Sequence, residues 1–317
     1  MPVLRVNKKL HFNIMKPETE RLLGTLEVLS HNPSSTLFWE TEIEGEFSLL
    51  KFMQQQGFIK LTDLEVAAEN WRETELRGTA GREDYYAPEP DYRNNLFDEE
   101  TKAFRSEKYS LLLEKIASNL EEIEAFIIGA HHLEEYSEWS HPYYDFCVVI
   151  GKTKDKDWLC LAPSVCNEVF YSTEKYTPKS QPKSTESFGK NTKKVLSQIR
   201  DIISELTPTM MYGYYGGGYN HTYNHQIFCE VATNKASAFE KALSQAGMLK
   251  ITDIEEVEHE DSLNSSSTIN PFLNSELYPL HAYYLAFWDI GYIYKVGQNS
   301  VGDWLGVSLL CEFEFNP

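Results

Sequence analysis

Two histidine-rich stretches carry residue types that commonly hold a metal ion or move a proton. His221 and His225 lie four residues apart in YGYYGGGYNHTYNH, a spacing that would present two imidazoles to one ion if the segment were helical. The surrounding glycines and tyrosines instead favour an ordered loop over residues 212–225. The second stretch, HHLEE at 131–135, is typical of a polar connection between strands. We therefore expect no metal site at either stretch.

The familiar catalytic motifs are missing from the sequence. It contains no GxxxxGK[ST] phosphate loop, no GxSxG nucleophile elbow and no HExxH. Its most glycine-rich segment, residues 213–218, lacks the lysine and the helix start that a phosphate cradle needs. We predict that the protein is not an enzyme and needs no cofactor.

Several carboxylates occur twice at equivalent places and could suggest a duplicated acid pair. No partner base accompanies them, so a structural use is the better interpretation. An aspartate that follows Lys-x-Thr suits a helix N-cap or a turn. An aspartate before tryptophan suits a polar turn from which the indole returns to the core. The repeated residues are Glu40 and Glu230, Asp63 and Asp253, and the pairs Asp157-Trp158 and Asp303-Trp304.

The net charge restricts the class of partner. The 317 residues include 29 Lys and Arg against 48 Asp and Glu, a formal net charge of -19. Binding to nucleic acid or to an anionic membrane rewards basic side chains, so we predict neither. A basic protein is the partner that such a charge attracts.

The cysteines and the apolar runs indicate a cytoplasmic protein. No apolar run approaches the roughly 20 residues that span a bilayer, and the first 20 residues lack the apolar core of a secretory signal. The five cysteines are odd in number, widely spread and not arranged as CxxC, which is typical of buried thiols in a reducing compartment. They are Cys147, Cys160, Cys166, Cys229 and Cys311.

The sequence repeats itself. Residues 36–66 align with residues 226–256 without a gap and share nine identities, where chance would give about one or two. A second match joins GKTKDKDWL at 151–159 to GQNSVGDWL at 297–305. A polar stretch rich in Lys, Pro and Ser lies between the two copies and is a linker by composition. We predict a tandem duplication with a first copy at 1–170, a linker at 171–187 and a second copy at 188–317.

The hydrophobic pattern predicts similar elements in both copies. Consecutive hairpins at the end of each copy favour a mainly antiparallel sheet packed by helices, an α+β fold. Residues 67–100 have no strong period and are expected to form a long excursion. The expected helices are 19–29, 47–56, 109–123, 193–206 and 237–246, and the expected strands are 37–39, 58–61, 125–129, 145–150, 157–162, 226–230, 292–296 and 304–315.

The order of these elements resembles the nuclease A inhibitor family. The residues that carry the resemblance are Phe38-Trp39-Glu40, the helix segment IASNL at 116–120, and Val149-Ile150-Gly151 with Trp158-Leu159. The resemblance covers about 17–163 as one unit and, more faintly, 188–317 as a second. It implies two tandem α-β-α sandwich domains and a protein that blocks a sugar-nonspecific nuclease by occupying its active-site cleft.

The resemblance also implies where a partner would bind. Family members use an acidic, aromatic segment before the long helix, which corresponds here to Phe97, Asp98, Glu99 and Glu100. They also use the C-terminal end, which corresponds to Glu314, Asn316 and Pro317. The family's turn glutamate is replaced in the first copy by Leu29. The alternative is therefore a tandem protein-interaction module that has lost the inhibitory contacts and binds an unrelated partner.

Overall fold

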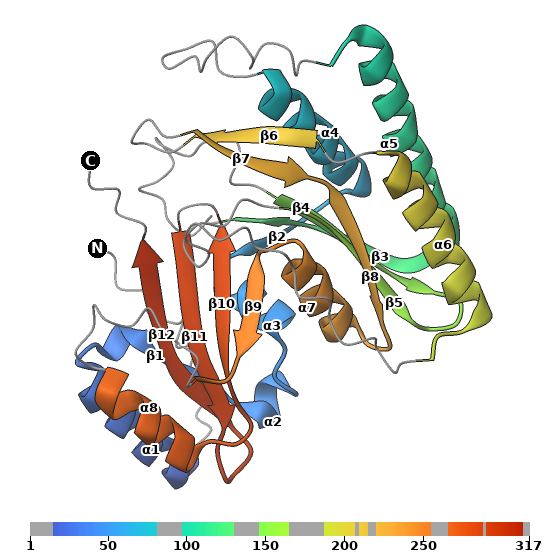
Figure 1. The fold of residues 1–317 in the computed structure, drawn as a ribbon. Coiled ribbons are helices and arrows are strands. Elements are labelled where there is room, and N and C mark those ends of the chain that lie inside the picture. Colours follow the sequence, from blue (N-terminus) through green and yellow to red (C-terminus); the bar gives the residue numbers. More distant parts are fainter. Residues whose placement is uncertain are drawn as a thin grey trace. The chain divides into compact units, whose positions relative to one another are not determined.

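The computed structural model describes residues 15–80, 97–129, 146–164, 187–206, 209–214, 220–254, 266–287 and 290–312 (Figure 1). The fold is α+β, with two antiparallel five-stranded sheets that helices pack against. The chain divides into two compact units, which we call the central unit and the terminal unit. The central unit comprises residues 48–249, 286–290 and 312–317, and the terminal unit comprises residues 1–47, 250–285 and 291–311.

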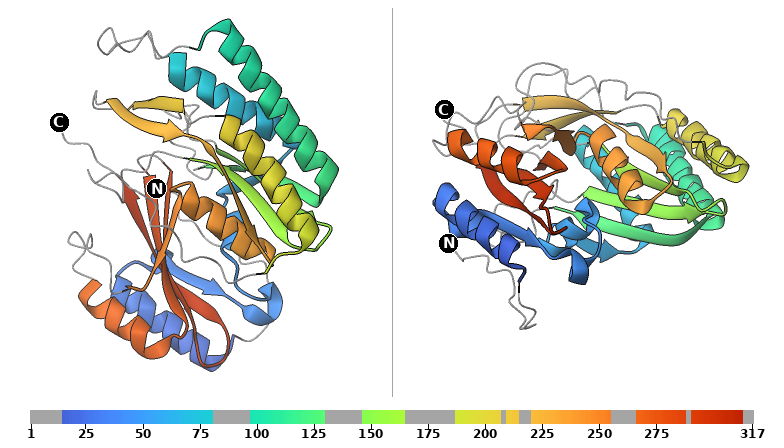
Figure 2. Two further views of the ribbon diagram at one scale, coloured as in Figure 1. Left: turned by 45° about the vertical axis from the view of Figure 1, so that its right-hand side comes forward. Right: turned by 90° about the horizontal axis from the view of Figure 1, so that it is seen from below.

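The central unit contains a sheet with helices on both faces. Its strand order is β2-β3-β4-β5-β8, and every neighbouring pair is antiparallel. Helices α4, α5 and α6 lie along one face, as Figures 1 and 2 show, and α7 lies on the other, where Phe239 meets Phe126 at 6.4 Å between ring centroids. The elements are β2 (Ile59–Thr62), β3 (Leu120–Ile128), β4 (Phe146–Thr153), β5 (Trp158–Pro163), β8 (Ile227–Ala232), α3 (Leu49–Gln55), α4 (Leu64–Ala80), α5 (Glu99–Asn119), α6 (Lys190–Glu205) and α7 (Lys235–Gln245).

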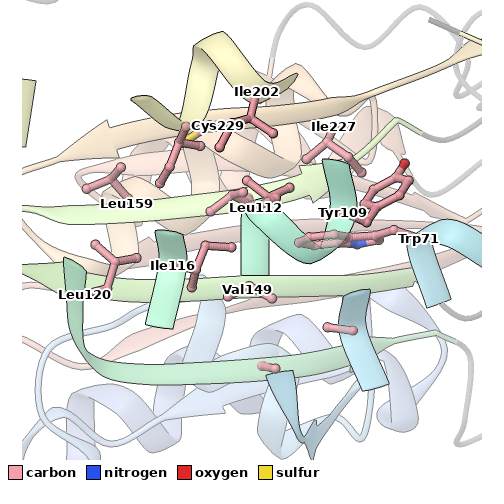
Figure 3. Packing of buried hydrophobic residues seen from close by; sticks show 14 of the residues in the cluster. Trp71, Tyr109, Leu112, Ile116, Leu120, Val149, Leu159, Ile202, Ile227 and Cys229 are labelled. Atoms are coloured by element: carbon pink, nitrogen blue, oxygen red, sulfur yellow. The ribbon is translucent and has the colours of Figure 1, made fainter. Parts of the chain in front are cut away.

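The main core of the central unit lies between its sheet and the layer of three helices (Figure 3). Leu112 and Ile116 on α5 and Ile199 on α6 are fully buried against Val149 and Leu159 of the sheet. The alternation of strand side chains explains both faces, because Ala125 points into this core while its neighbour Phe126 points toward α7. The α-β-α sandwich expected from the sequence is therefore present in the central unit.

The terminal unit is built from both ends of the chain. Its strand order is β1-β12-β11-β10-β9, and its helices α1 and α8 pack against each other. Lys295 on β11 is buried and donates from Nζ to Asn270 Oδ1 of α8 at 2.9 Å. The elements are α1 (Pro17–Ser30), η1 (Pro33–Ser35), β1 (Thr36–Trp39), α2 (Thr41–Glu44), β9 (Leu249–Thr252), α8 (Ser266–Glu276), β10 (Leu280–Phe287), β11 (Ile290–Gln298) and β12 (Trp304–Glu312).

The domain boundaries predicted from the sequence, 1–170 and 188–317, are wrong. Strand β1 of the first half pairs with β12 of the second half, and β8 of the second half pairs with β5 of the first. Strands β5 and β12 both begin with Trp-Leu, so either of them could serve as the partner of β1 or of β8. The hydrophobic pattern of the sequence does not select between these two pairings. Most of the expected linker, residues 171–186, lies outside the described residues.

The two aligned segments nevertheless adopt the same order of elements. Strand β1, helix α3 and strand β2 in the first segment correspond to β8, α7 and β9 in the second. Helices α3 and α7 each end before a glycine in the left-handed region, Gly57 at φ 81° and Gly247 at φ 82°, where a side chain would be strained. The two helices end within one residue of the ends expected from the sequence, 56 and 246.

Several segments differ from the predicted elements. The helix expected at 109–123 begins ten residues earlier and ends at Asn119, and residues 120–123 belong to β3. The expected excursion contains α4, a helix of 17 residues, because Ala67, Trp71 and Glu75 recur at helical spacing and are buried. The expected loop over 212–225 contains strand residues, because β6 (Thr209–Tyr214) pairs with β7 (Asn220–His225) as a hairpin. Helix α8 and strand β10 were not predicted.

Candidate partner-binding segment at the start of helix α5

The predicted acidic, aromatic segment lies where α5 begins. Asp98 is the N-cap, and its side chain accepts a hydrogen bond from the amide of Thr101 at 2.7 Å. Glu99 and Glu100 occupy the first turn, where carboxylates interact favourably with the positive end of the helix dipole. Local helix chemistry therefore fixes the Asp98 side chain and favours two further carboxylates in the turn that follows it.

The three carboxylates of this segment face solvent. Hydrogen bonds from the Thr101 side chain and amide lower the pKa of Asp98 below its ordinary value, since they favour the charged form. Glu99 accepts from Lys102 Nζ at 2.7 Å, and both Glu99 and Glu100 face solvent. Asp98 thus keeps its negative charge to a lower pH than an ordinary aspartate does.

A buried ion pair anchors the aromatic end of the segment. The guanidinium of Arg105 lies 5.0 Å from the centre of the Phe97 ring, within the range of a cation–π contact. Arg105 also donates two hydrogen bonds to Glu75 of α4, from Nε at 2.9 Å and from Nη2 at 2.6 Å, and Tyr109 Oη donates to the same carboxylate at 2.6 Å. The start of α5 is thereby tied to the core beside α4.

The pKa values of this network follow from burial and pairing. Burial acts to lower the pKa of Arg105, but the hydrogen bonds and the negative charge of Glu75 raise it by more. The pKa of Arg105 therefore lies above its ordinary value. Burial and the nearby Glu75 charge together hold the pKa of Tyr109 well above its usual range. Arg105 therefore stays cationic and Tyr109 stays a neutral donor, as their hydrogen bonds require.

The sequence reasoning missed this network. Glu75 fell in the stretch interpreted as an excursion, and Arg105 fell before the expected start of the long helix at 109. The available signal was the four-residue spacing of Trp71 with Glu75 and of Arg105 with Tyr109, which places each pair on one helix face.

The second predicted contact region is not placed by the structure. Glu314, Asn316 and Pro317 lie outside the described residues. Of the two regions named from the sequence, only Phe97–Glu100 belongs to the described residues, so whether the two regions meet stays a prediction.

The structure places one of the two histidine stretches on a strand. His221 and His225 both belong to strand β7, where residues four apart are separated by about 13 Å, too far to share one ion. His225 is fully buried, and burial lowers its pKa. The stretch at 131–135 lies outside the described residues, and no group of three or more metal-ligating side chains occurs among the residues described.

The repeated Asp-Trp motifs have a structural role. Asp157 accepts from Thr192 Oγ1 at 2.7 Å, and Asp303 accepts from Thr19 Oγ1 at 2.7 Å. Thr192 is in the first turn of α6 and Thr19 is in the first turn of α1. Each aspartate therefore fixes the start of the helix that packs on its own sheet. A structural role was expected from the sequence, but this contact with a helix was not predicted.

Comparison with known proteins gives no relative for this chain: no family model, no curated protein and no solved structure matches it. Within the part of the chain that the structure describes, no helix is long and apolar enough to cross a membrane.

Proposed function

We propose that this chain is a non-enzymatic, acidic binding protein of the cytoplasm that resembles the nuclease A inhibitors. On this proposal it blocks a sugar-nonspecific nuclease by occupying its active-site cleft. The observation that carries the proposal is the run of three carboxylates, Asp98 to Glu100, held at the start of α5.

The physical argument is one of charge and rigidity. A nuclease cleft that binds phosphates is basic, and carboxylates on a rigid helix turn can occupy the positions that phosphates would take. The N-cap hydrogen bond of Asp98 and the Arg105 contact to Phe97 fix the segment before binding, which lowers the entropy lost on association. The net charge of -19 favours fast encounter with a basic partner.

The test mixes the purified full chain with a sugar-nonspecific nuclease, or with a nuclease encoded beside it, and follows DNA degradation. We expect inhibition that weakens as salt is added, because the contacts are electrostatic. The informative variant combines Asp98→Asn with Glu99→Lys and Glu100→Lys, since asparagine preserves the N-cap while the segment loses its negative charge. This variant should restore nuclease activity.

A charge-matched control separates local contact from net charge. Glu20→Gln with Glu27→Lys and Glu121→Lys makes the same charge change at exposed positions of α1 and β3, and it should still inhibit. Full nuclease activity at a micromolar excess of the unmodified chain would refute nuclease inhibition. The protein-interaction module with an unrelated partner would then be the remaining function.

A further inference from the structure

The outer side of α5 exposes a large aromatic residue that the candidate segment does not include. Phe104 is 43% exposed, and it lies one turn after Glu100 on the helix. Burying an aromatic ring of this kind contributes strongly to protein association, so Phe104 is available as an anchor for a partner.

The neighbours of Phe104 define an acidic helical stripe. Positions 100, 104, 107 and 114 follow one another at helical spacing and all face solvent. Glu100, Glu107 and Glu114 thus line the helix on both sides of the ring, and we call these four residues the α5 stripe. Ala103, beside the ring, is small and exposed, so a neighbouring surface can reach Phe104.

The ring is also fixed in place. Lys108 Nζ lies 5.2 Å from the centre of the Phe104 ring, and the same ammonium forms an ion pair with Glu205 at the end of α6. The Lys108 side chain is only 17% exposed, which restricts its motion and that of the ring beneath it. An aromatic anchor that is ordered in advance loses little entropy on binding.

In α6, which packs against α5, the lysines and the carboxylates lie toward opposite ends of the helix. Helix α5 packs between α4 and α6, and the Lys108–Glu205 pair joins the N-terminal half of α5 to the C-terminal end of α6. Exposed Asp201 and Glu205 therefore lie at the same end of the layer as Phe104, while the lysines of α6, at 190, 193 and 194, are in its first turns at the other end.

We infer that the α5 stripe is a docking surface for a basic protein, with Phe104 as the apolar anchor that enters a pocket of the partner. This inference rests on the proposed function and extends the predicted contact from the first turn of α5 to its second. Acidic residues around the ring accelerate the encounter, and burial of the ring slows dissociation.

The experiment measures binding of the full chain to an immobilised sugar-nonspecific nuclease by surface plasmon resonance. Phe104→Ala should raise Kd by at least about tenfold, mainly through faster dissociation. The matched control is Val28→Ala, which removes an exposed apolar side chain of α1 and should change Kd by less than about twofold. Glu100→Gln with Glu107→Gln should instead slow association, most strongly at low salt.

The outcomes separate this inference from the function on which it rests. If the unmodified chain binds the nuclease and Phe104→Ala binds equally well, the stripe is not the docking surface, although inhibition stands. If the unmodified chain neither binds nor inhibits the nuclease, both proposals fail. Thermal unfolding of each variant serves as the check on folding, and Phe104→Ala should unfold like the unmodified chain because the ring is exposed.

Discussion

A partly buried glutamate on α7 makes the stability of the central unit depend on pH. Glu240 is half-buried, and its removal from water raises its pKa to about 7, even though the amide of Leu49 at the start of α3 donates a hydrogen bond to it. In the unfolded chain the pKa lies near 4.5. Ionisation of Glu240 is therefore less favourable in the folded protein than in the unfolded chain.

The sign and size of the effect follow from these two pKa values. The raised pKa means that the folded protein binds the proton more tightly, so the free energy of unfolding falls as the pH rises from about 4.5 to about 7 and then stays constant. A difference of about 2.5 between the pKa values corresponds to about 3 kcal/mol. This loss is complete above pH 7 and absent below pH 4.5.

The perturbation is Glu240→Gln, which keeps an oxygen for the Leu49 amide but cannot ionise. We expect the variant to be more stable than the unmodified chain by up to about 3 kcal/mol at pH 8 and equally stable near pH 4. Urea denaturation followed by circular dichroism across this pH range measures the difference. Glu107→Gln on the exposed side of α5 is the control and should give the same small difference at every pH.

Two results would contradict this reasoning. Suppose that the Glu240→Gln variant is no more stable than the unmodified chain at pH 8. Ionisation of Glu240 would then be no less favourable in the folded protein than in the unfolded chain. A stabilisation that is equally large at pH 4 and pH 8 would mean that the effect comes from packing and not from the charge.

Further predictions concern the buried Arg105–Glu75 pair and the boundaries of the two compact units. Arg105→Ala should destabilise the protein by about 3–5 kcal/mol, because it leaves the Glu75 charge buried without its main partner. Urea denaturation measures this change, and a loss of less than about 1 kcal/mol would contradict the role given to this pair. A fragment of residues 48–249 should unfold cooperatively, since it holds all five strands of the central sheet, while a fragment of 188–317 should not, because it lacks α1 and β1. Cooperative unfolding of the second fragment alone would show that β8 can replace β1 beside β12.

Much of the secondary structure could be predicted from the sequence because it depends on neighbours along the chain. The apolar spacing of Leu22 and Leu26 in α1 and of Val195 and Ile199 in α6 marks a helix face. Gly57 and Gly247 mark helix ends because only glycine takes positive φ without strain. The antiparallel α+β class followed from consecutive strands at the end of each repeat.

The candidate site was only partly predictable. The acidity of Phe97–Glu100 is visible in the sequence, but the N-cap role of Asp98 depends on where α5 starts. The sequence analysis instead placed residues 67–100 in a long excursion and started the helix at residue 109. The exposure of Phe104 and the Lys108–Glu205 pair depend on how α5 packs against α6. The sequence around Phe104 does not reveal that its ring faces solvent, because charged residues surround it along the helix on every side.

By itself the sequence determined the repeated set of elements, the negative charge and the residue types available for binding. The tertiary structure decided which strands share a sheet, placing β1 beside β12 and β8 beside β5, and which charges meet in the interior, such as Arg105 with Glu75. The physical reason is that strand pairing and ion pairing join residues far apart in the chain. When two copies offer similar partners, the choice depends on the packing of the whole unit and not on the local sequence.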